Sequence, residues 1–230
     1  VYVRSVASLE VSDTVFIGGA AITTAGIYVA SSSVVDISST RFIGNEAGGS
    51  TAIYTPSSTD SALAEVAFTG NTANGSYIVN LGGDSVVTDV DFTGNTASNL
   101  AFMQNLSATG IRVQANSSSY LYVYGSFAIE DVSIINNRGT YAYLRGSGTI
   151  DNLVVAGNRA ITQGVYLVGT DIDLTNSTIV GNDGDGLNLS TTERRSMYVT
   201  NTIVAYNTDD GIYVSSSYAP ELAYNNVWAN

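Results

Sequence analysis

The chain repeats one four-residue phrase throughout its length: an apolar residue, a variable residue, a small residue and asparagine. The clearest copies end at Asn45, Asn71, Asn95, Asn158 and Asn182, and looser copies end at Asn116, Asn137, Asn207 and Asn230. One further copy carries Gly19 in place of the asparagine. When these last residues are taken as anchors, successive anchors lie 21 to 26 residues apart. A period in this range, sustained over a whole chain, predicts a stacked solenoid.

Within a repeat, apolar and polar residues alternate in short runs. One repeat alternates over 171–174, again just before its anchor at 178–180, and a third time over 186–189. A period of two is typical of strands, and no segment shows apolar residues at helical spacing. Three short strands per turn and ten anchors predict an all-β parallel β-helix of about ten turns. We expect residues 1–230 to form this single domain, without helical caps.

The anchor asparagines invite two structural interpretations. A tight corner needs a residue that tolerates left-handed backbone angles, and asparagine does so. An inward asparagine can also pass amide hydrogen bonds from turn to turn as a ladder. A second polar column lies six residues before the anchor and predicts turn chemistry at the preceding corner; its members are Glu65, Asp89, Asp131, Asn152, Asn176 and Asn201.

Two runs carry a resemblance to a known family: 201–207 followed by 211–214, and the similar run 176–189. They resemble the right-handed parallel β-helix repeat proteins of the pectate-lyase-like superfamily. That resemblance implies the right-handed fold and an extracellular setting. It implies no single activity, because such proteins include polysaccharide lyases and hydrolases as well as adhesins and surface proteins without catalysis.

Charge narrows the class of partner. The formal net charge is −12 and all eight basic residues are arginine, with no His, Lys or Cys. An acidic surface disfavours nucleic acid and anionic membranes, so we expect neither partner, and no apolar run is long enough for membrane insertion. The Ser-, Thr-, Asn- and Tyr-rich composition favours an extracellular or cell-surface protein.

Catalysis can be examined by elimination. Hydrolases of this superfamily that need His, and lyases that need Lys, are excluded because the chain has neither residue. The resemblance then leaves the lyases that use Arg as the base beside acidic Ca²⁺ ligands. The candidate bases are Arg112, Arg138, Arg145, Arg159, Arg194 and Arg195. The candidate Ca²⁺ ligands are Asp183, Asp185, Asp209 and Asp210, which are equally typical of solvated turns. The sequence predicts no required cofactor, with Ca²⁺ as the metal for which it offers ligands, and it favours a non-enzymatic protein.

Tyrosines recur at one position in the third strand of several turns. Tyr122, Tyr143, Tyr166 and Tyr213 each stand between two apolar residues, so stacked turns should align them on an outer face. Tyr suits protein interfaces and sugar stacking, and it also stabilises exposed sheets. Trp228 belongs to a weaker outward column two residues before the anchors. We expect these five residues to contact a partner, which is another copy of the chain, a glycan or a cell surface.

The ends of the chain read as strand, without Pro, charge or helix to blunt them, so we expect either a longer parent solenoid or head-to-tail self-association. The sequence therefore predicts an extracellular structural or adhesive β-solenoid, with a filament subunit that assembles end to end as one form of it. The alternative is a carbohydrate-active protein, either a glycan binder or a Ca²⁺-dependent lyase.

Overall fold

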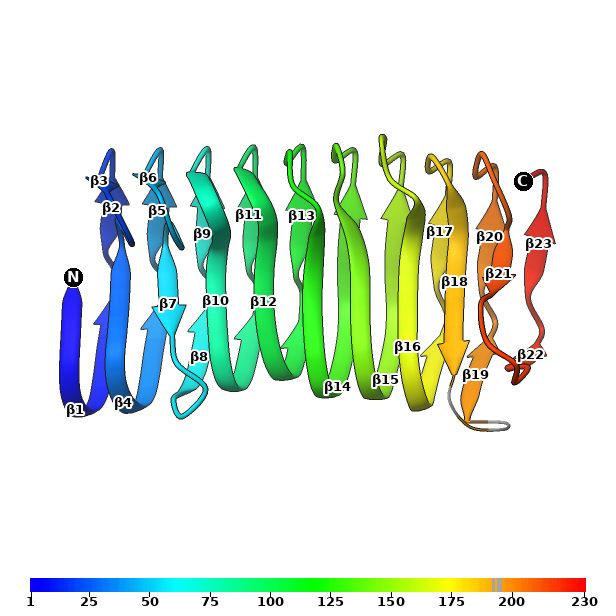
Figure 1. Cartoon of the computed structure of the whole chain (residues 1–230), viewed down its shortest axis with the longest axis horizontal. Helices are drawn as coiled ribbons and strands as arrows, with labels where there is room; N and C mark the ends of the chain where they lie inside the picture. The colour runs from blue at the N-terminus through cyan, green and yellow to red at the C-terminus, as the bar shows by residue number, and fades with distance from the viewer. Residues whose placement is uncertain (192, 194–195) are drawn as a thin grey trace.

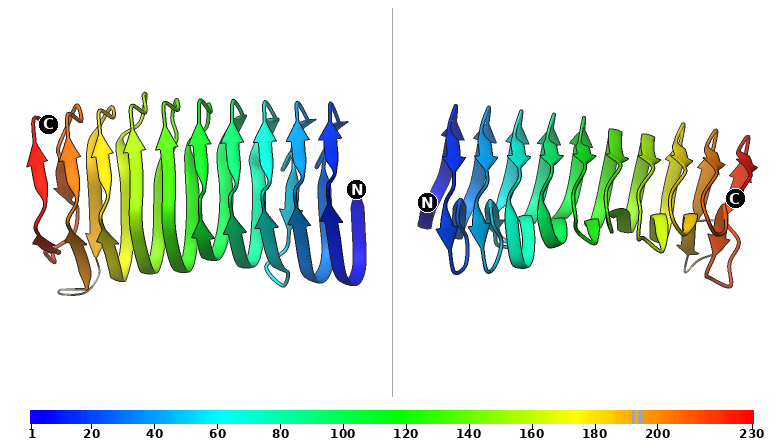
Figure 2. Two further views of the ribbon diagram at one scale, coloured as in Figure 1. Left: turned by 180° about the vertical axis from the view of Figure 1, so that it is seen from behind. Right: turned by 90° about the horizontal axis from the view of Figure 1, so that it is seen from above.

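A computed structural model describes residues 1–191, 193 and 196–230 as a rod of stacked coils (Figure 1). All regular structure in the described residues is β-strand, and about ten turns follow one another along the axis. Figure 2 shows that the coils keep the same outline from one end of the rod to the other. The all-β parallel solenoid predicted from the sequence is confirmed, and the described residues contain no helix.

Each turn contributes to three outer faces. The anchor face precedes the asparagines and contains β2 (Val15–Ile17), β5 (Arg41–Ile43), β9 (Ala67–Thr69), β11 (Asp91–Thr93), β13 (Arg112–Gln114), β17 (Thr178–Val180), β20 (Ile203–Ala205) and β23 (Asn226–Trp228). The aromatic face contains β7 (Ile53–Thr55), β18 (Asp185–Thr191) and β21 (Ile212–Val214). The third face contains β8 (Asp60–Ala64), β19 (Met197–Thr200) and β22 (Glu221–Ala223).

Longer strands bend around a corner and join two or three faces. β1 (Tyr2–Ser12), β4 (Ile27–Ser38), β10 (Thr72–Thr88), β12 (Thr96–Thr109) and β16 (Gln163–Thr175) run from the aromatic face into the third face. β14 (Tyr120–Ile135) and β15 (Tyr141–Ala156) continue into the anchor face. Short strands β3 (Ala20–Ala21) and β6 (Glu46–Ala47) follow the first two anchors. Every strand pairing is parallel and joins equivalent positions of adjacent turns.

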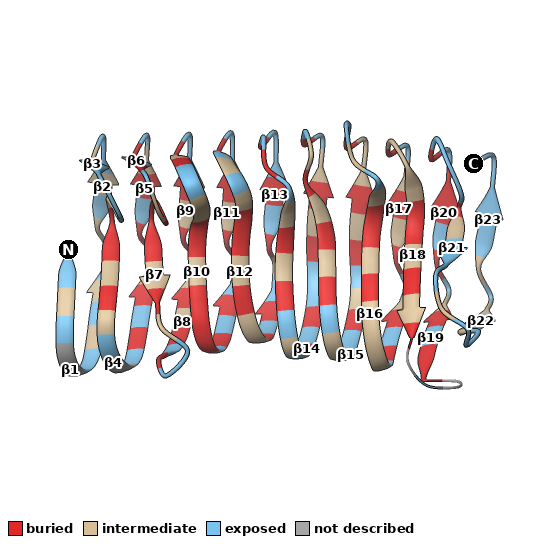
Figure 3. Ribbon diagram, viewed as in Figure 1, coloured by how far each residue is buried: buried red, intermediate tan, exposed pale blue. Residues whose placement is uncertain are grey.

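The core is a continuous apolar column inside the coil. Burial alternates along most strands of the middle turns, as Figure 3 shows, so that about every second side chain there points inward. Phe16, Phe42, Phe68 and Phe92 stack in this column at centroid distances of 4.7 to 5.1 Å. The apolar residue of the repeat phrase is therefore the core residue of the anchor face.

The anchor asparagines form a buried ladder. The side-chain Nδ2 of each donates to the Oδ1 of the next anchor, from Asn45 through Asn207 to Asn230, at 2.9 or 3.0 Å. Where the asparagine is missing, the Gly19 N–H still donates to Asn45 Oδ1. The ladder interpretation is thus confirmed.

The left-handed corner lies one residue before the anchor, not at it. Gly44, Gly70 and Gly94 have φ between 59° and 65°, and Asn136 and Tyr206 adopt similar values at the equivalent positions. The expectation that the anchors themselves take this conformation was wrong, because their inward amides are needed for the ladder. The second polar column does occupy a left-handed corner, with φ from 50° to 56° at all six predicted residues.

Candidate functional site

The predicted tyrosines lie in one column on the aromatic face, which is turned toward the viewer in Figure 1. Strand register aligns, turn after turn, Tyr2, Tyr28, Tyr54, Asn80, Phe102, Tyr122, Tyr143, Tyr166, Asn188 and Tyr213. In the middle turns the neighbours of each ring along its strand are inward and buried; Leu121 and Val123 flank Tyr122, for example. Eight of these ten positions are aromatic, so the column extends well beyond the four tyrosines chosen from the sequence.

Rings in the column stack on one another. The ring centroids of Tyr122 and Tyr143 are 4.7 Å apart with a 19° angle between planes, and Tyr143 and Tyr166 are 5.1 Å apart at 18°. Tyr28 stacks in the same way between Tyr2 and Tyr54. Because neighbouring rings cover each other's faces, the stacked runs present ring edges and hydroxyl groups to solvent.

A second aromatic column runs beside the first. Tyr120 pairs in register with Tyr141, and Tyr120 packs edge-on against both Tyr122 and Tyr143, at 5.8 and 5.9 Å between centroids. Tyr77 extends this column two turns earlier and contacts Phe102. Analysis of the sequence missed these residues, although the alternation Tyr120-Leu121-Tyr122-Val123-Tyr124 places three rings on one side of β14.

Crowding perturbs the phenol groups at the centre of this surface. Burial, followed by the neighbouring Tyr120, raises the pKa of Tyr141 above its ordinary value. Burial and Tyr122 raise the pKa of Tyr143, whose hydroxyl also contacts Arg145. Burial likewise raises the pKa of Tyr77. Each phenol therefore stays neutral to a higher pH than a free tyrosine, because the phenolate would be poorly solvated.

A groove of about 460 Å³ follows the edge of the aromatic face. Tyr124, Arg145 and Val168 line it in register, together with Ser147 and Thr170. Its floor is a column of glycines at 125, 146 and 169, with φ of 100°, 144° and 146°. A Cβ at Gly146 would overlap the Gly125 carbonyl oxygen, so a side chain cannot fill the floor. The Tyr124 ring is 45% exposed and borders this open space.

The predicted carboxylates divide into two groups. Asp185, Asp209 and Asp210 each place one carboxylate oxygen within 4.8 Å of the others, and the Asp210 N–H donates to Asp185 Oδ1 at 3.2 Å. Asp183 is not brought into this trio, because its Oδ2 accepts from the Ala160 N–H at 2.8 Å. Desolvation, with the charges of Asp209 and Asp210, raises the pKa of Asp185.

Three carboxylates from adjacent turns are hard oxygen ligands of the kind that Ca²⁺ prefers, although a full shell needs six to eight oxygens. Among the described residues, the one ion pair joins Arg112 Nε to Asp91 at 2.7 Å, so no described arginine is paired with this trio. The candidate bases Arg194 and Arg195 lie outside the described residues. The structure therefore assembles three carboxylates as candidate ligands for a cation. No arginine in the described part of the chain forms an ion pair with them.

Trp228 lies on a different face from the tyrosines. It belongs to β23 on the anchor face, is 46% exposed, and packs edge-on against Tyr206 at 4.6 Å between centroids. It is in the predicted outward column, in register with Ala205. The structure thus joins Tyr122, Tyr143 and Tyr166 in one surface and leaves Trp228 apart from it.

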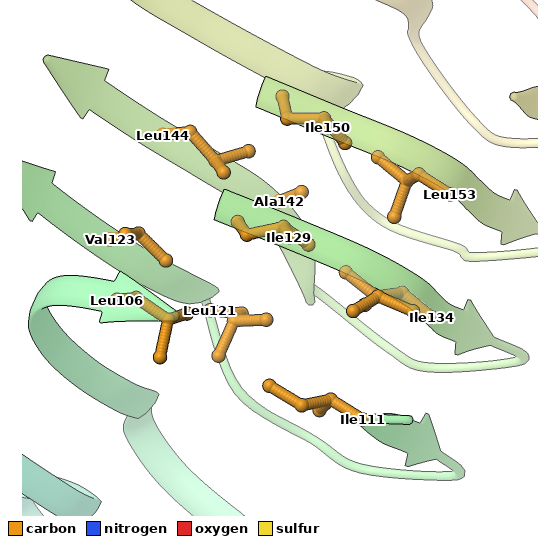
Figure 4. Close-up of a pocket in the computed structure, with 11 residues that line it drawn as sticks. Leu106, Ile111, Leu121, Val123, Ile129, Ile134, Ala142, Leu144, Ile150 and Leu153 are labelled. Atoms are coloured by element: carbon orange, nitrogen blue, oxygen red, sulfur yellow. The ribbon is translucent and has the colours of Figure 1, made fainter. Parts of the chain in front are cut away.

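One cavity lies inside the coil, and it is too small for a ligand. A cavity of about 10 Å³ lies among apolar side chains of three turns, including Leu121, Val123, Ala142 and Leu144 (Figure 4). This volume is about that of one water probe, and its lining has almost no polar partner for a water molecule. This cavity therefore belongs to the apolar core and has no space for a ligand.

The comparison with protein families agrees with this architecture. The family described as "Right handed beta helix region" matches residues 109–230, which is more than half of the chain. The chain belongs to this family. No curated protein and no solved structure gave a significant match. In this right-handed β-helix protein, no helix of the described part is long and apolar enough to cross a membrane.

Family membership in the right-handed β-helix proteins accounts for the ladder, the corners and the stacked core. It assigns no substrate, because the same coil supports binding and catalytic surfaces of many kinds. The matched region includes the turns with Tyr122, Tyr143 and Tyr166, the glycine-floored groove and the carboxylate trio. What the protein does must therefore be argued from these outer features.

Proposed function

We propose that this protein is an extracellular structural or adhesive β-solenoid that makes contacts through its aromatic face. The observation that carries the proposal is the double column of rings around Tyr120, Tyr122, Tyr141 and Tyr143 on a regular sheet. Such a surface combines large apolar area with hydroxyl groups at its rim, which is the composition that protein interfaces favour. The Ser-, Thr-, Asn- and Tyr-rich composition supports the extracellular setting.

Self-association is the form of adhesion that can be measured without knowing another partner. Rods can pair side by side through their aromatic faces, which buries the rings of both copies. They can also assemble end to end into a filament, which extends the strand pairing between turns. Both modes belong to the proposal, and the aromatic face is required for the first mode alone.

Sedimentation velocity of a triple variant tests the role of this face. Tyr122→Ser, Tyr143→Ser and Tyr166→Ser together should shift a self-associating wild type toward monomer by at least tenfold in dissociation constant. The matched control changes three tyrosines elsewhere, Tyr198, Tyr218 and Tyr224, to serine. An equal shift in both variants, or none in the first, would count against the aromatic face as the contact surface.

Glycan binding is the second candidate, and the glycine-floored groove favours it. The stacked rings of Tyr122 and Tyr143 have little free face for a sugar, whereas Tyr124 is exposed beside Arg145, Ser147 and Thr170. A sugar ring stacked on Tyr124 could hydrogen-bond these side chains. Titration with a panel of neutral oligosaccharides tests this candidate, and Tyr124→Ser should abolish binding while Tyr218→Ser should not.

A further inference from the structure

A second groove lies at the corner between the anchor face and the aromatic face. It has a volume of about 540 Å³ and crosses three successive turns. The corners on two of these turns are short, at residues 117–119 and 138–140, so little chain covers the hollow. Ser117, Arg138 and Arg159 lie in register along it, and Asn136 completes the polar side chains of its lining beside the buried anchors.

The polar side chains of this groove lack protein partners. Among the described residues, the side chains of Ser117, Asn136, Arg138 and Arg159 make no hydrogen bond. Other exposed polar columns are matched between turns. Asn152 donates to Asp131 at 2.6 Å, and Asn201 donates to Asn176 at 2.6 Å. The groove differs from these two columns, because its polar groups face solvent instead of one another.

The two arginines also repel each other. Arg138 and Arg159 pair in register on adjacent turns, ~4.8 Å apart along the axis, where like charges destabilise a sheet. Neither forms an ion pair within the described part of the chain, where the one ion pair joins Arg112 and Asp91. Asp183 follows Arg159 by one turn, but its Oδ2 accepts from the Ala160 N–H and it forms no ion pair with Arg159.

We propose that this groove is a binding site for oxyanion groups, carboxylate or sulfate, held between Arg138 and Arg159. A guanidinium group presents a fork of N–H donors that matches the two oxygens of such a group. Ser117 and Asn136 supply further donors on the same wall. A bound oxyanion relieves the repulsion between the arginines and satisfies all four side chains, which no described protein group does.

The overall charge sets the character of this site. With a net charge of −12, the protein repels anions at long range, so binding depends on short-range contacts with these two arginines. A ligand that carries oxyanions on successive units can engage both guanidinium groups at once, and a single small anion can engage them less well. The site is separate from the aromatic face, and the proposal does not depend on the role proposed for that face.

Calorimetric titration with three oligosaccharides of equal length tests the proposal: a sulfated one, a polyuronate and a neutral one. We expect the wild type to bind at least one acidic probe and to ignore the neutral probe. Which acidic probe binds identifies the anion as sulfate or carboxylate. The double variant Arg138→Gln and Arg159→Gln should weaken this binding at least tenfold, and added salt should weaken it further.

The control is Arg4→Gln with Arg41→Gln, which removes the same charge from exposed positions on the first turns. Neither double variant should lower the thermal midpoint of the wild type, since the altered side chains are exposed, and loss of the repulsion between Arg138 and Arg159 should raise it slightly. The proposal is overturned when neither acidic probe binds the wild type. It is equally overturned when both double variants lose affinity alike, because the effect is then one of net charge.

Discussion

Asn95 donates both its backbone N–H and its side-chain Nδ2 to the side-chain oxygen of Asn116, each at 2.9 Å. Asn116 does the same toward Asn137, so one buried oxygen per turn accepts two hydrogen bonds. The remaining Nδ2 hydrogen of Asn95 reaches the Phe68 carbonyl oxygen at 2.8 Å. The ladder thus ties the backbone of three turns together through one side chain.

Replacing Asn116 by alanine should cost about 3 kcal/mol of unfolding free energy, because it leaves two buried donors of Asn95 without an acceptor. The measurement is urea denaturation followed by circular dichroism. Asn80→Ala is the matched control, since Asn80 is half-buried on the outer face and its side chain makes no hydrogen bond within the described residues. Equal losses in the two variants would contradict a structural ladder.

The ladder shows how much of the fold can be predicted from the sequence. A strict column of asparagines beside Phe42, Phe68 and Phe92 predicts a stacked coil, because burial of an amide requires a partner in the next turn. The exact corner could not be predicted. Gly44, Asn136 and Tyr206 all take the left-handed conformation before an anchor, and these residue types share no pattern that marks the position.

Asp185 should make stability depend on pH. Its folded-state pKa is raised by desolvation and by Asp209 and Asp210, so the native state favours the protonated form and loses stability as pH rises through that pKa. Asp185→Asn should therefore stabilise the protein at neutral pH and have little effect in acid. Asn keeps the oxygen that accepts from the Asp210 N–H. Thermal midpoints across this pH range provide the measurement.

Asp173→Asn is the control for charge alone, because Asp173 is exposed on the third face in register with Thr149 and Tyr198. An equal pH-dependent gain in this variant would argue against repulsion within the trio.

The same measurement tests the metal site. Ca²⁺ held by the trio should raise the thermal midpoint of the wild type, and Asp185→Ala or Asp210→Ala should abolish that rise. A wild-type midpoint indifferent to Ca²⁺ would leave these carboxylates as turn residues.

Alkaline titration should reveal the crowded phenols. Tyr77, Tyr141 and Tyr143 have raised pKa values, so the native protein should contain tyrosines that ionise later than free tyrosine. Stability should fall as pH rises through this range, because the unfolded chain ionises first. The measurement is the ultraviolet absorbance of phenolate in Tyr141→Phe and Tyr143→Phe, which should lose late-titrating groups. Tyr224→Phe, at a 92% exposed position, is the control and should leave the late-titrating groups in place.

The sequence could predict the tyrosine column but not the surface around it. Tyr122, Tyr143 and Tyr166 occupy equivalent positions in regular turns, so counting from the anchors aligns them. The grooves depend on corner length and on which side chains find partners, and those follow from contacts between turns. Asp183 illustrates the limit, because its bond to Ala160 separates it from the other three carboxylates.

Electron microscopy of the wild-type protein over a range of concentrations tests the central claim most directly. The account predicts rods that associate side by side as concentration rises, and that remain single after serine replaces Tyr122, Tyr143 and Tyr166. Long filaments one rod wide would show end-to-end assembly without use of the aromatic face. Single short rods at every concentration would contradict the proposal that this face mediates self-association.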